Sequence, residues 1–235
     1  MSKIFQVGTF ISLLNKIYRG DLTLEEIKRH ADLGIGTFDD LDGELILLNG
    51  KFYKIVDDGV VKEPDLLEKV PFFVGSFFKD EKVIEVDKKI DFDNLQEIIK
   101  NNLDSDNFIY TILVEGEFEE LKLRAIRKQE KPYKPIYSNE EGIQSEFSFE
   151  KEKGFLVGTF FPKYLHGINV SGLHIHFINS EKMLGGHVMN LKANFSRIKI
   201  CKHLDFKCHL IHSEEVLNTE FQTNFDKEIK KVERG

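Results

Sequence analysis

The sequence has few cysteines, no long apolar run and no excess of positive charge. Only Cys201 and Cys208 occur in 235 residues, and the first residues lack the apolar core of a secretory signal. We therefore expect two reduced thiols in a cytoplasmic protein. No uninterrupted apolar run is long enough to span a membrane, so no membrane association is expected. The net charge of −7, without a basic stripe, argues against nucleic-acid binding and favours a small-molecule partner.

Local patterns predict a mixture of helices and strands in which strands are the majority. Asn49-Gly50 indicates a type I′ turn inside a hairpin over residues 43–55. Thr23 and Glu26 form a capping box for a short helix that Gly34 ends. Asp91 is expected to cap a helix that ends near residue 103, and Ser213 a short helix that ends near residue 221. We expect residues 4–14 to begin as a strand and to continue as a helix. Further strands are predicted at residues 72–78, 82–86, 108–114, 120–126, 144–149, 155–161, 167–179, 187–200 and 205–212.

These elements predict an α+β fold, with mixed and antiparallel β-sheets in two closely packed halves and a few short helices. The stretch over residues 128–135 contains Pro132 and Pro135 and is the best internal boundary. We therefore predict an N-terminal α+β half of residues 1–127 and a β-rich C-terminal half of residues 128–235.

Three histidines lie close together in the C-terminal half. His174 and His176 are two apart on a predicted strand, so they project from one face, and His187 follows the pair Gly185-Gly186. A turn after residue 179 can bring His187 beside the other two. Three neutral imidazoles on a divalent metal leave coordination positions open, as in a catalytic site. A histidine on a strand is more often a core or surface residue than a ligand, so the spacing alone leaves a packing role open.

Several further segments, in their order and spacing, resemble the α-acetolactate decarboxylase family along nearly the whole chain. The similar pieces are residues 36–44, Leu123-Arg124-Ala125, Gln129 with Lys131-Pro132, Gly154 with Val157-Gly158, Pro162 with residues 167–170, the two histidine segments and the tail over residues 229–233.

The resemblance implies a carboxy-lyase that converts (S)-2-acetolactate to (R)-acetoin and CO2 in the acetoin and butanediol pathway. It implies Zn²⁺, or another divalent metal, on His174, His176 and His187, where the metal stabilises an enediolate as a Lewis acid. No organic cofactor is implied, which fits the absence of nucleotide-binding glycine patterns. We expect a homodimer as one possible state, although the sequence does not determine the oligomeric state.

The same resemblance assigns three other site residues. Arg124 is the active-site arginine, suited to a carboxylate or an adjacent oxyanion. Glu44 and Glu233 are the two acids, and which of them donates a proton to the enediolate stays open. Apart from the resemblance, Thr37 is a lesser candidate, because its hydroxyl can hydrogen-bond to substrate or water. Glu233 requires the C-terminal tail to fold back over the pocket.

Two other function classes stay open from the residues alone. A zinc hydrolase would use the same histidines, but the sequence has no His-Glu-x-x-His pattern. A non-catalytic metal-binding protein would make the charged site residues coincidental. The acidic run over residues 39–43 lacks the ligand spacing of a calcium loop and is read as a turn. A second cluster, His203, His209 and His212, suits no single strand face and is assigned no site role.

Overall fold

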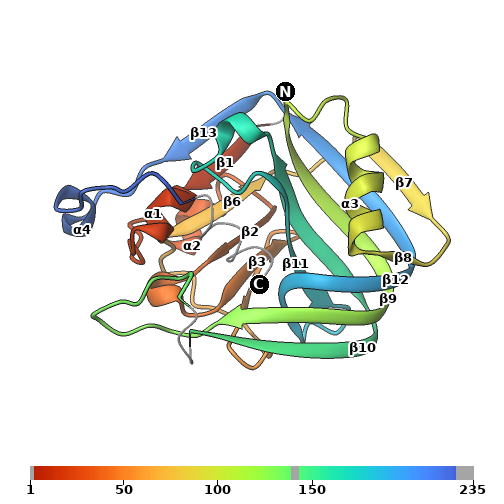
Figure 1. Ribbon diagram of the computed structural model, residues 1–235, viewed down its shortest axis with the longest axis horizontal. Helices are drawn as coiled ribbons and strands as arrows, with labels where there is room; N and C mark the ends of the chain where they lie inside the picture. The colour runs from red at the N-terminus through yellow and green to blue at the C-terminus, as the bar shows by residue number, and fades with distance from the viewer. Residues whose placement is uncertain (1–2, 139–142, 226–235) are drawn as a thin grey trace.

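The computed structural model describes residues 3–138 and 143–225, which form two β-sheets with a few short helices (Figure 1). The first sheet has seven strands in the order β13-β1-β6-β2-β3-β4-β5. Its strands are β1 (Lys3–Val7), β2 (Leu33–Thr37), β3 (Glu44–Leu48), β4 (Lys51–Ile55), β5 (Val61–Lys62), β6 (Phe72–Ser76) and β13 (Asp205–His209). Because β1 and β13 are parallel and the other neighbours antiparallel, the sheet is mixed.

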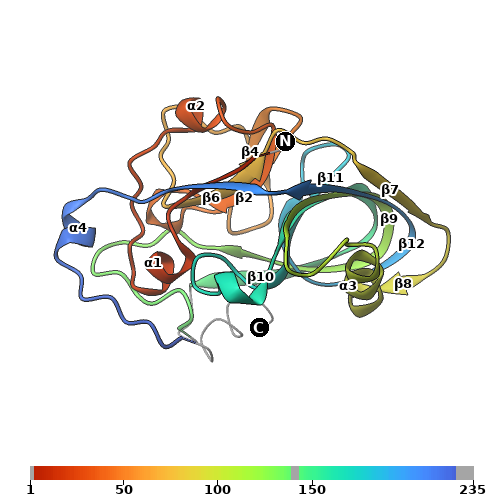
Figure 2. The ribbon, with the colours of Figure 1, turned by 90° about the horizontal axis from the view of Figure 1, so that it is seen from above.

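The second sheet is antiparallel and is built on long strands. Its members are β7 (Lys82–Val86), β8 (Ile90–Asp91), β9 (Ile109–Ile126), β10 (Gln144–Phe161), β11 (Gly172–Asn179) and β12 (Gly185–His203). The strand β11 pairs with β10 and also with β12, which itself pairs with β9, so these four strands close into a ring (Figure 2). The expected α+β fold with mixed and antiparallel sheets is confirmed.

Helices occupy the margins of the two sheets. They are α1 (Phe10–Leu14), α2 (Leu24–Ile27), α3 (Phe92–Asn101) and α4 (Glu214–Leu217), with 3₁₀ turns at Asp39–Leu41 and Lys163–Leu165. The predicted caps Thr23, Asp91 and Ser213 each accept a backbone N–H at the start of a helix. No helix in the described part of the chain is long and apolar enough to cross a membrane.

Three of the sequence predictions about element boundaries were wrong. The helix after Thr23 ends at Ile27, and Gly34 lies inside β2, where a Cβ would come within 2.5 Å of the Val74 carbonyl oxygen. The glycine therefore permits close strand packing rather than ending a helix. The predicted pairs of strands in β9 and in β10 are single continuous strands. At their middle Gly116 lies opposite Gly154, which weakens the local β signal, but pairing with neighbouring strands carries each strand through. The helix after Ser213 ends at Leu217.

Strand alternation sorts the side chains into three apolar clusters. One fills the layer between the two sheets and contains Ile35, Ile46 and Ile178. A second lies inside the ring and under α3, and a third packs the outer face of the first sheet against α2. Along a strand, a residue two positions from a member of the first cluster also faces the layer between the two sheets. That layer is where the candidate site lies.

The division of the chain at residues 127 and 128 stays a prediction. The sheets mix the two segments, because β9 pairs with β10 and β12 while β13 pairs with β1.

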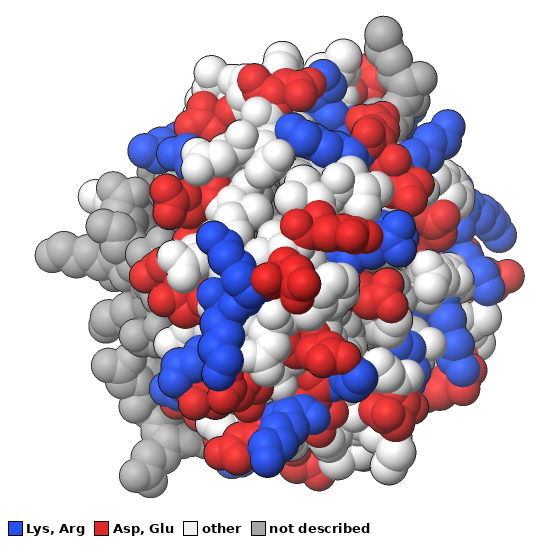
Figure 3. Space-filling view, turned by 90° about the vertical axis from the view of Figure 1, so that its right-hand side faces the viewer, with Lys and Arg blue, Asp and Glu red and all other residues white. Residues whose placement is uncertain are grey.

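On the face that carries α3 and β7, acidic and basic side chains are interspersed (Figure 3). Two of the ion pairs here are Lys89–Glu119 and Arg197–Glu85.

Candidate active site

The structure brings His174, His176 and His187 together from two neighbouring strands. His176 on β11 lies directly opposite His187 on β12, and His174 precedes His176 by two residues on the same face. One potential ligand atom from each lies within 4.8 Å of the other two. All three side chains are buried, and their ring centroids are 5.1 to 5.3 Å apart. The turn that returns the chain therefore places the third imidazole as the sequence predicted.

Burial keeps two of these imidazoles neutral. It lowers the pKa of His174 to about 3, with a smaller contribution from the Arg124 charge. Burial also lowers the pKa of His176 well below its ordinary 6.5, and His174 adds to that effect. A neutral imidazole has a lone pair to offer, which is the form that binds a metal.

The hydrogen bonding of His176 favours a cation beside it. Its Nδ1 lies 3.2 Å from the backbone oxygen of Leu45, and since a carbonyl only accepts, Nδ1 carries the proton. Its Nε2 therefore presents a lone pair, 3.5 Å from a carboxyl oxygen of Glu44. Nε2 of His176 and Nδ1 of His174 are buried without a hydrogen-bond partner among the described residues. One acceptor nitrogen on His176 and two further imidazoles that each bring a potential ligand atom within 4.8 Å fit a divalent ion, with Leu45 fixing the His176 ring from the opposite sheet.

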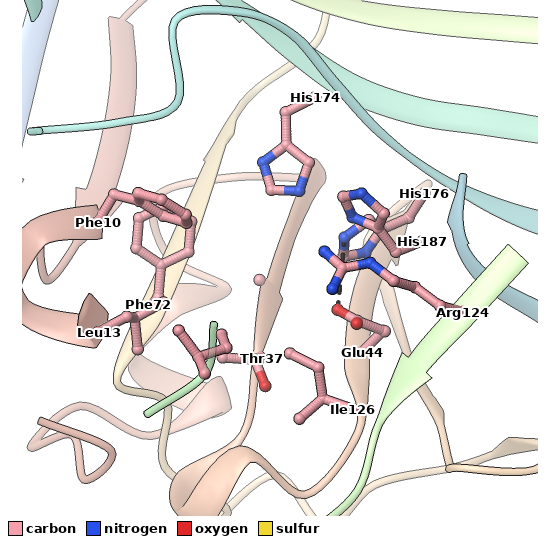
Figure 4. Close-up of a pocket in the computed structure, with 12 residues that line it drawn as sticks. Phe10, Leu13, Thr37, Glu44, Phe72, Arg124, Ile126, His174, His176 and His187 are labelled. Carbon is pink, nitrogen blue, oxygen red and sulfur yellow. Dashed lines mark ion pairs between the residues drawn. The ribbon is translucent and has the colours of Figure 1, made fainter. Parts of the chain in front are cut away.

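Glu44 and Arg124 both point into the same layer. Glu44 begins β3 two residues before Ile46, and Arg124 lies on β9 two residues before Ile126. The two residues are 4% and 2% exposed, so neither lies on the protein surface. Figure 4 shows the guanidinium beside Glu44, His176 and His187. One of its nitrogens, Nη1, donates to the side-chain oxygen of Gln144 at 2.6 Å.

Thr37 lies in the same pocket, opposite Glu44 in the pairing of β2 with β3. Its hydroxyl donates to the backbone oxygen of Gly43 at 2.7 Å. Since the hydroxyl proton is used, Thr37 can only accept from a ligand. The bond also ties down the turn that leads into Glu44.

The pocket is small and has one polar and one apolar side (Figure 4). Sequence reasoning missed its apolar wall and the contact of Arg124 with Gln144, because neither carries a chemical motif. The spacing of three between Phe10 and Leu13 on a short helix was the one available signal. The wall consists of Phe10, Leu13, Phe72, Ile126 and Ile136.

The remaining sequence candidates lie elsewhere. Glu233 and the tail expected to cover the pocket fall outside the described residues. The acidic run forms a turn whose carboxylates pair with cations, Asp40 with Arg19 and Asp42 with Lys54. His203 is buried against Thr111, and His209 lies 3.0 Å from Asp21. Among the described residues, only the first three histidines gather as a potential metal-binding group.

Comparison with known proteins gives one consistent result. Residues 4–223 match the family model described as alpha-acetolactate decarboxylase. Proteins of that name from Bacillus licheniformis and Methanosarcina mazei are 35% and 34% identical, over 97% and 98% of this chain and 88% and 80% of their own lengths. The crystal structure of alpha-acetolactate decarboxylase from Bacillus subtilis strain 168 superposes with a TM-score of 0.96 at 34% identity and covers 100% of both chains. A Staphylococcus aureus protein described as similar to this enzyme gives a TM-score of 0.88 at 27% identity, over 98% of each chain.

Proposed function

We propose that this chain, which belongs to the alpha-acetolactate decarboxylase family of carboxy-lyases, converts (S)-2-acetolactate to (R)-acetoin and CO2. The observation that carries the proposal is the meeting of three buried imidazoles, one arginine and one glutamate in a small pocket. A site that binds only an apolar ligand would not bury these polar and charged side chains, because removing each of them from water costs free energy.

The substrate is itself a β-keto acid, so the electrons left by departing CO2 pass to its ketone. His174, His176 and His187 would hold zinc or another divalent metal, which would act as a Lewis acid on the substrate. The remaining steps concern binding, orientation and proton transfer, which side chains of the chain itself perform.

Arg124 binds the anionic end of the substrate. A guanidinium stays charged in a buried site and presents several donors in a fixed plane, which matches a carboxylate. It also stabilises negative charge on a neighbouring oxygen as the carboxylate leaves. Its position beside the imidazoles in Figure 4 lets one substrate reach both groups.

Glu44 and Glu233 are the candidates for delivering a proton to one face of the enediolate. Glu44 lies within 3.5 Å of His176, so it is next to the reacting centre. Glu233 would reach the pocket through the tail. Delivery of the proton to a single face gives one enantiomer of acetoin. The hydroxyl of Thr37, which can only accept a hydrogen bond from a ligand, orients the substrate hydroxyl or a water.

The apolar wall selects small alkyl groups and keeps water from the reacting carbons. Phe10 and Phe72 meet edge to face with ring centroids 6.1 Å apart, which makes this wall rigid. The methyl groups of acetolactate fit such a wall. The cytoplasmic location and the homodimer remain proposals from the sequence.

The decisive experiment incubates the purified protein with racemic acetolactate and follows acetoin by colour reaction and its handedness by chiral gas chromatography. Metal content is measured on the same sample, and activity is measured again after chelation and after adding Zn²⁺ back. We expect about one metal per chain, formation of (R)-acetoin, loss on chelation and recovery with zinc. Metal without acetoin formation would favour the hydrolase or the non-catalytic alternative, and ester hydrolysis would separate those two.

A further inference from the structure

The three histidines of the pocket meet because the chain returns sharply between β11 and β12. His176 lies opposite His187 in this pairing, and beyond them the backbone N–H of Asn179 donates to the oxygen of Leu184 at 2.9 Å. Residues 180–183 form the return. A slip of one residue in the register would turn His187 to the opposite face of the sheet, away from the other two imidazoles. The geometry of the return therefore decides whether the third imidazole reaches the site.

The carboxamide of Asn179 closes this return. Its oxygen accepts the backbone N–H groups of Met183 at 2.9 Å and of Leu184 at 3.1 Å. Its nitrogen donates to a carboxyl oxygen of Glu152 on β10 at 3.3 Å. Since a carboxylate only accepts, the amide nitrogen faces Glu152 and leaves the amide oxygen for the two backbone groups. The residue is 4% exposed, so water does not replace these bonds, and the side chain ties the end of β11 to the start of β12.

The return needs such a tie because its backbone is strained at one residue. Lys182 has a φ of 59°, in the left-handed region that a residue with a Cβ disfavours. Its backbone N–H donates to the backbone oxygen of Asn179 at 3.1 Å, and its Nζ donates to the same oxygen at 3.3 Å. The first sheet holds the return from outside, since the N–H of Val61 donates to the oxygen of Met183 at 2.9 Å. The bonds of Asn179 thus offset the cost of the left-handed residue.

We propose that Asn179 is a positioning residue for the metal site, because its carboxamide holds the return in the register that sets His187 opposite His176. The inference rests on the metal site of the proposed function. An ion that binds three imidazoles selects the molecules in which all three are in place. The apparent dissociation constant of the metal rises as the fraction of such molecules falls. Loosening the return should therefore weaken metal binding even though no ligand is removed.

The test measures metal affinity in variants that keep all three histidines. Competition with a chelator of known affinity gives the dissociation constant of Zn²⁺ for each purified protein. For Asn179→Ala we expect zinc to bind about 10- to 30-fold more weakly, the size of one or two lost hydrogen bonds to the backbone. At saturating zinc, acetoin formation should return to within about threefold of wild type, because the ligands are intact.

A second variant covers the case in which Asn179→Ala does not fold. Asn179→Gln keeps the amide but moves it by one methylene group away from the two backbone nitrogens. We expect a loss of zinc affinity similar to that of the alanine variant. Thermal unfolding without metal checks that each variant is folded.

A double variant isolates the two accepted bonds. Asn179→Asp combined with Glu152→Gln exchanges the donor and the acceptor of that contact and keeps an acceptor for both backbone N–H groups. Its zinc affinity should stay within about twofold of wild type. The matched control is Asp65→Ala, which removes a side-chain bond to the backbone N–H of Leu67 at 2.9 Å in the connection between β5 and β6. This control should leave zinc affinity unchanged.

Several results would overturn the inference. Wild-type zinc affinity in Asn179→Ala or, if that variant does not fold, in Asn179→Gln would do so. Equal weakening in Asp65→Ala would do so as well, because it indicates a general loss of stability. A double variant as weak as Asn179→Ala would show that the accepted bonds do not set the register. A wild-type protein that binds zinc but forms no acetoin would instead contradict the proposed function, while the affinity comparison would still decide the role of Asn179.

Discussion

Two groups of three histidines, each within a short stretch of chain, have opposite environments in this molecule. His174, His176 and His187 converge, with potential ligand atoms within 4.8 Å of one another. In the second group, His203 bonds Thr111 and His209 bonds Asp21, each with its own partner.

The difference comes from strand direction and register. In the first group a tight return from β11 to β12 sets His176 opposite His187, so chain neighbours become spatial neighbours. In the second group β12 ends at His203, and β13 leaves to pair with β1 in the other sheet. Close spacing of histidines is thus informative only when the chain between them turns back on itself.

The largest expected effect separates the two groups directly. Alanine at His174, His176 or His187 should remove the metal and lower kcat/KM by three orders of magnitude or more, on the order of the several kcal/mol that a Lewis acid supplies. Alanine at the exposed His212 should leave both unchanged. Elemental analysis and the acetoin assay measure this. Full metal occupancy in any two of the first three variants would remove the ligand assignment.

A second comparison concerns the two acids. Glu44→Gln and Glu233→Gln keep shape and hydrogen bonding but remove the titratable proton, and the variant that lacks the proton donor should lose about 10²- to 10⁴-fold in kcat. Deleting residues 229–235 should abolish acetoin formation while metal content and the thermal transition stay nearly intact. If the truncated enzyme keeps its normal rate and product handedness, Glu233 has no role and Glu44 is the remaining candidate.

The arginine is expected to show a smaller but clear effect. Arg124→Lys keeps the charge but loses the planar fork and the bond to Gln144, so we expect roughly a hundredfold loss of kcat/KM. The exposed Arg127→Lys is the matched control three residues along the same segment, and it should behave as wild type. Near wild-type kinetics of Arg124→Lys would take this residue out of the site.

The smallest expected effect lies in the second histidine group and concerns stability. Burial raises the pKa of Asp21, but the backbone N–H of His212 and the side chain of His209 outweigh it and hold the pKa below 3.8. A carboxyl whose pKa is lower in the folded than in the unfolded state stabilises the fold at pH values above its unfolded-state pKa. This stabilisation is lost as the pH falls through the folded-state pKa. Asp21→Asn should therefore cost under about 1 kcal/mol near neutral pH, since the pair is partly exposed.

Denaturant titrations of wild type and Asp21→Asn at several pH values measure that difference. It should shrink as the pH falls below about 3.8. A difference that stays constant with pH would mean that the ion pair and its bonds do not carry the effect. Acetoin formation should not change in this variant, because Asp21 lies outside the pocket.

The sequence by itself determined the local elements and indicated which residues are candidates for the site. Its caps, the Asn49-Gly50 turn and the period-two spacing of His174 and His176 depend on neighbouring residues, so they could be read without a fold. The order of family segments likewise indicated Arg124 and Glu44 as candidate site residues.

Only the tertiary structure decided how those residues meet. The lone pair that His176 presents depends on Leu45 in the other sheet, and Arg124 donates a hydrogen bond to Gln144 across a strand pair. The apolar wall joins α1, β6, β9 and the segment that carries Ile136. Such contacts link residues far apart in the chain, and their energy depends on burial and strand register. Neither quantity is written in any local stretch of sequence.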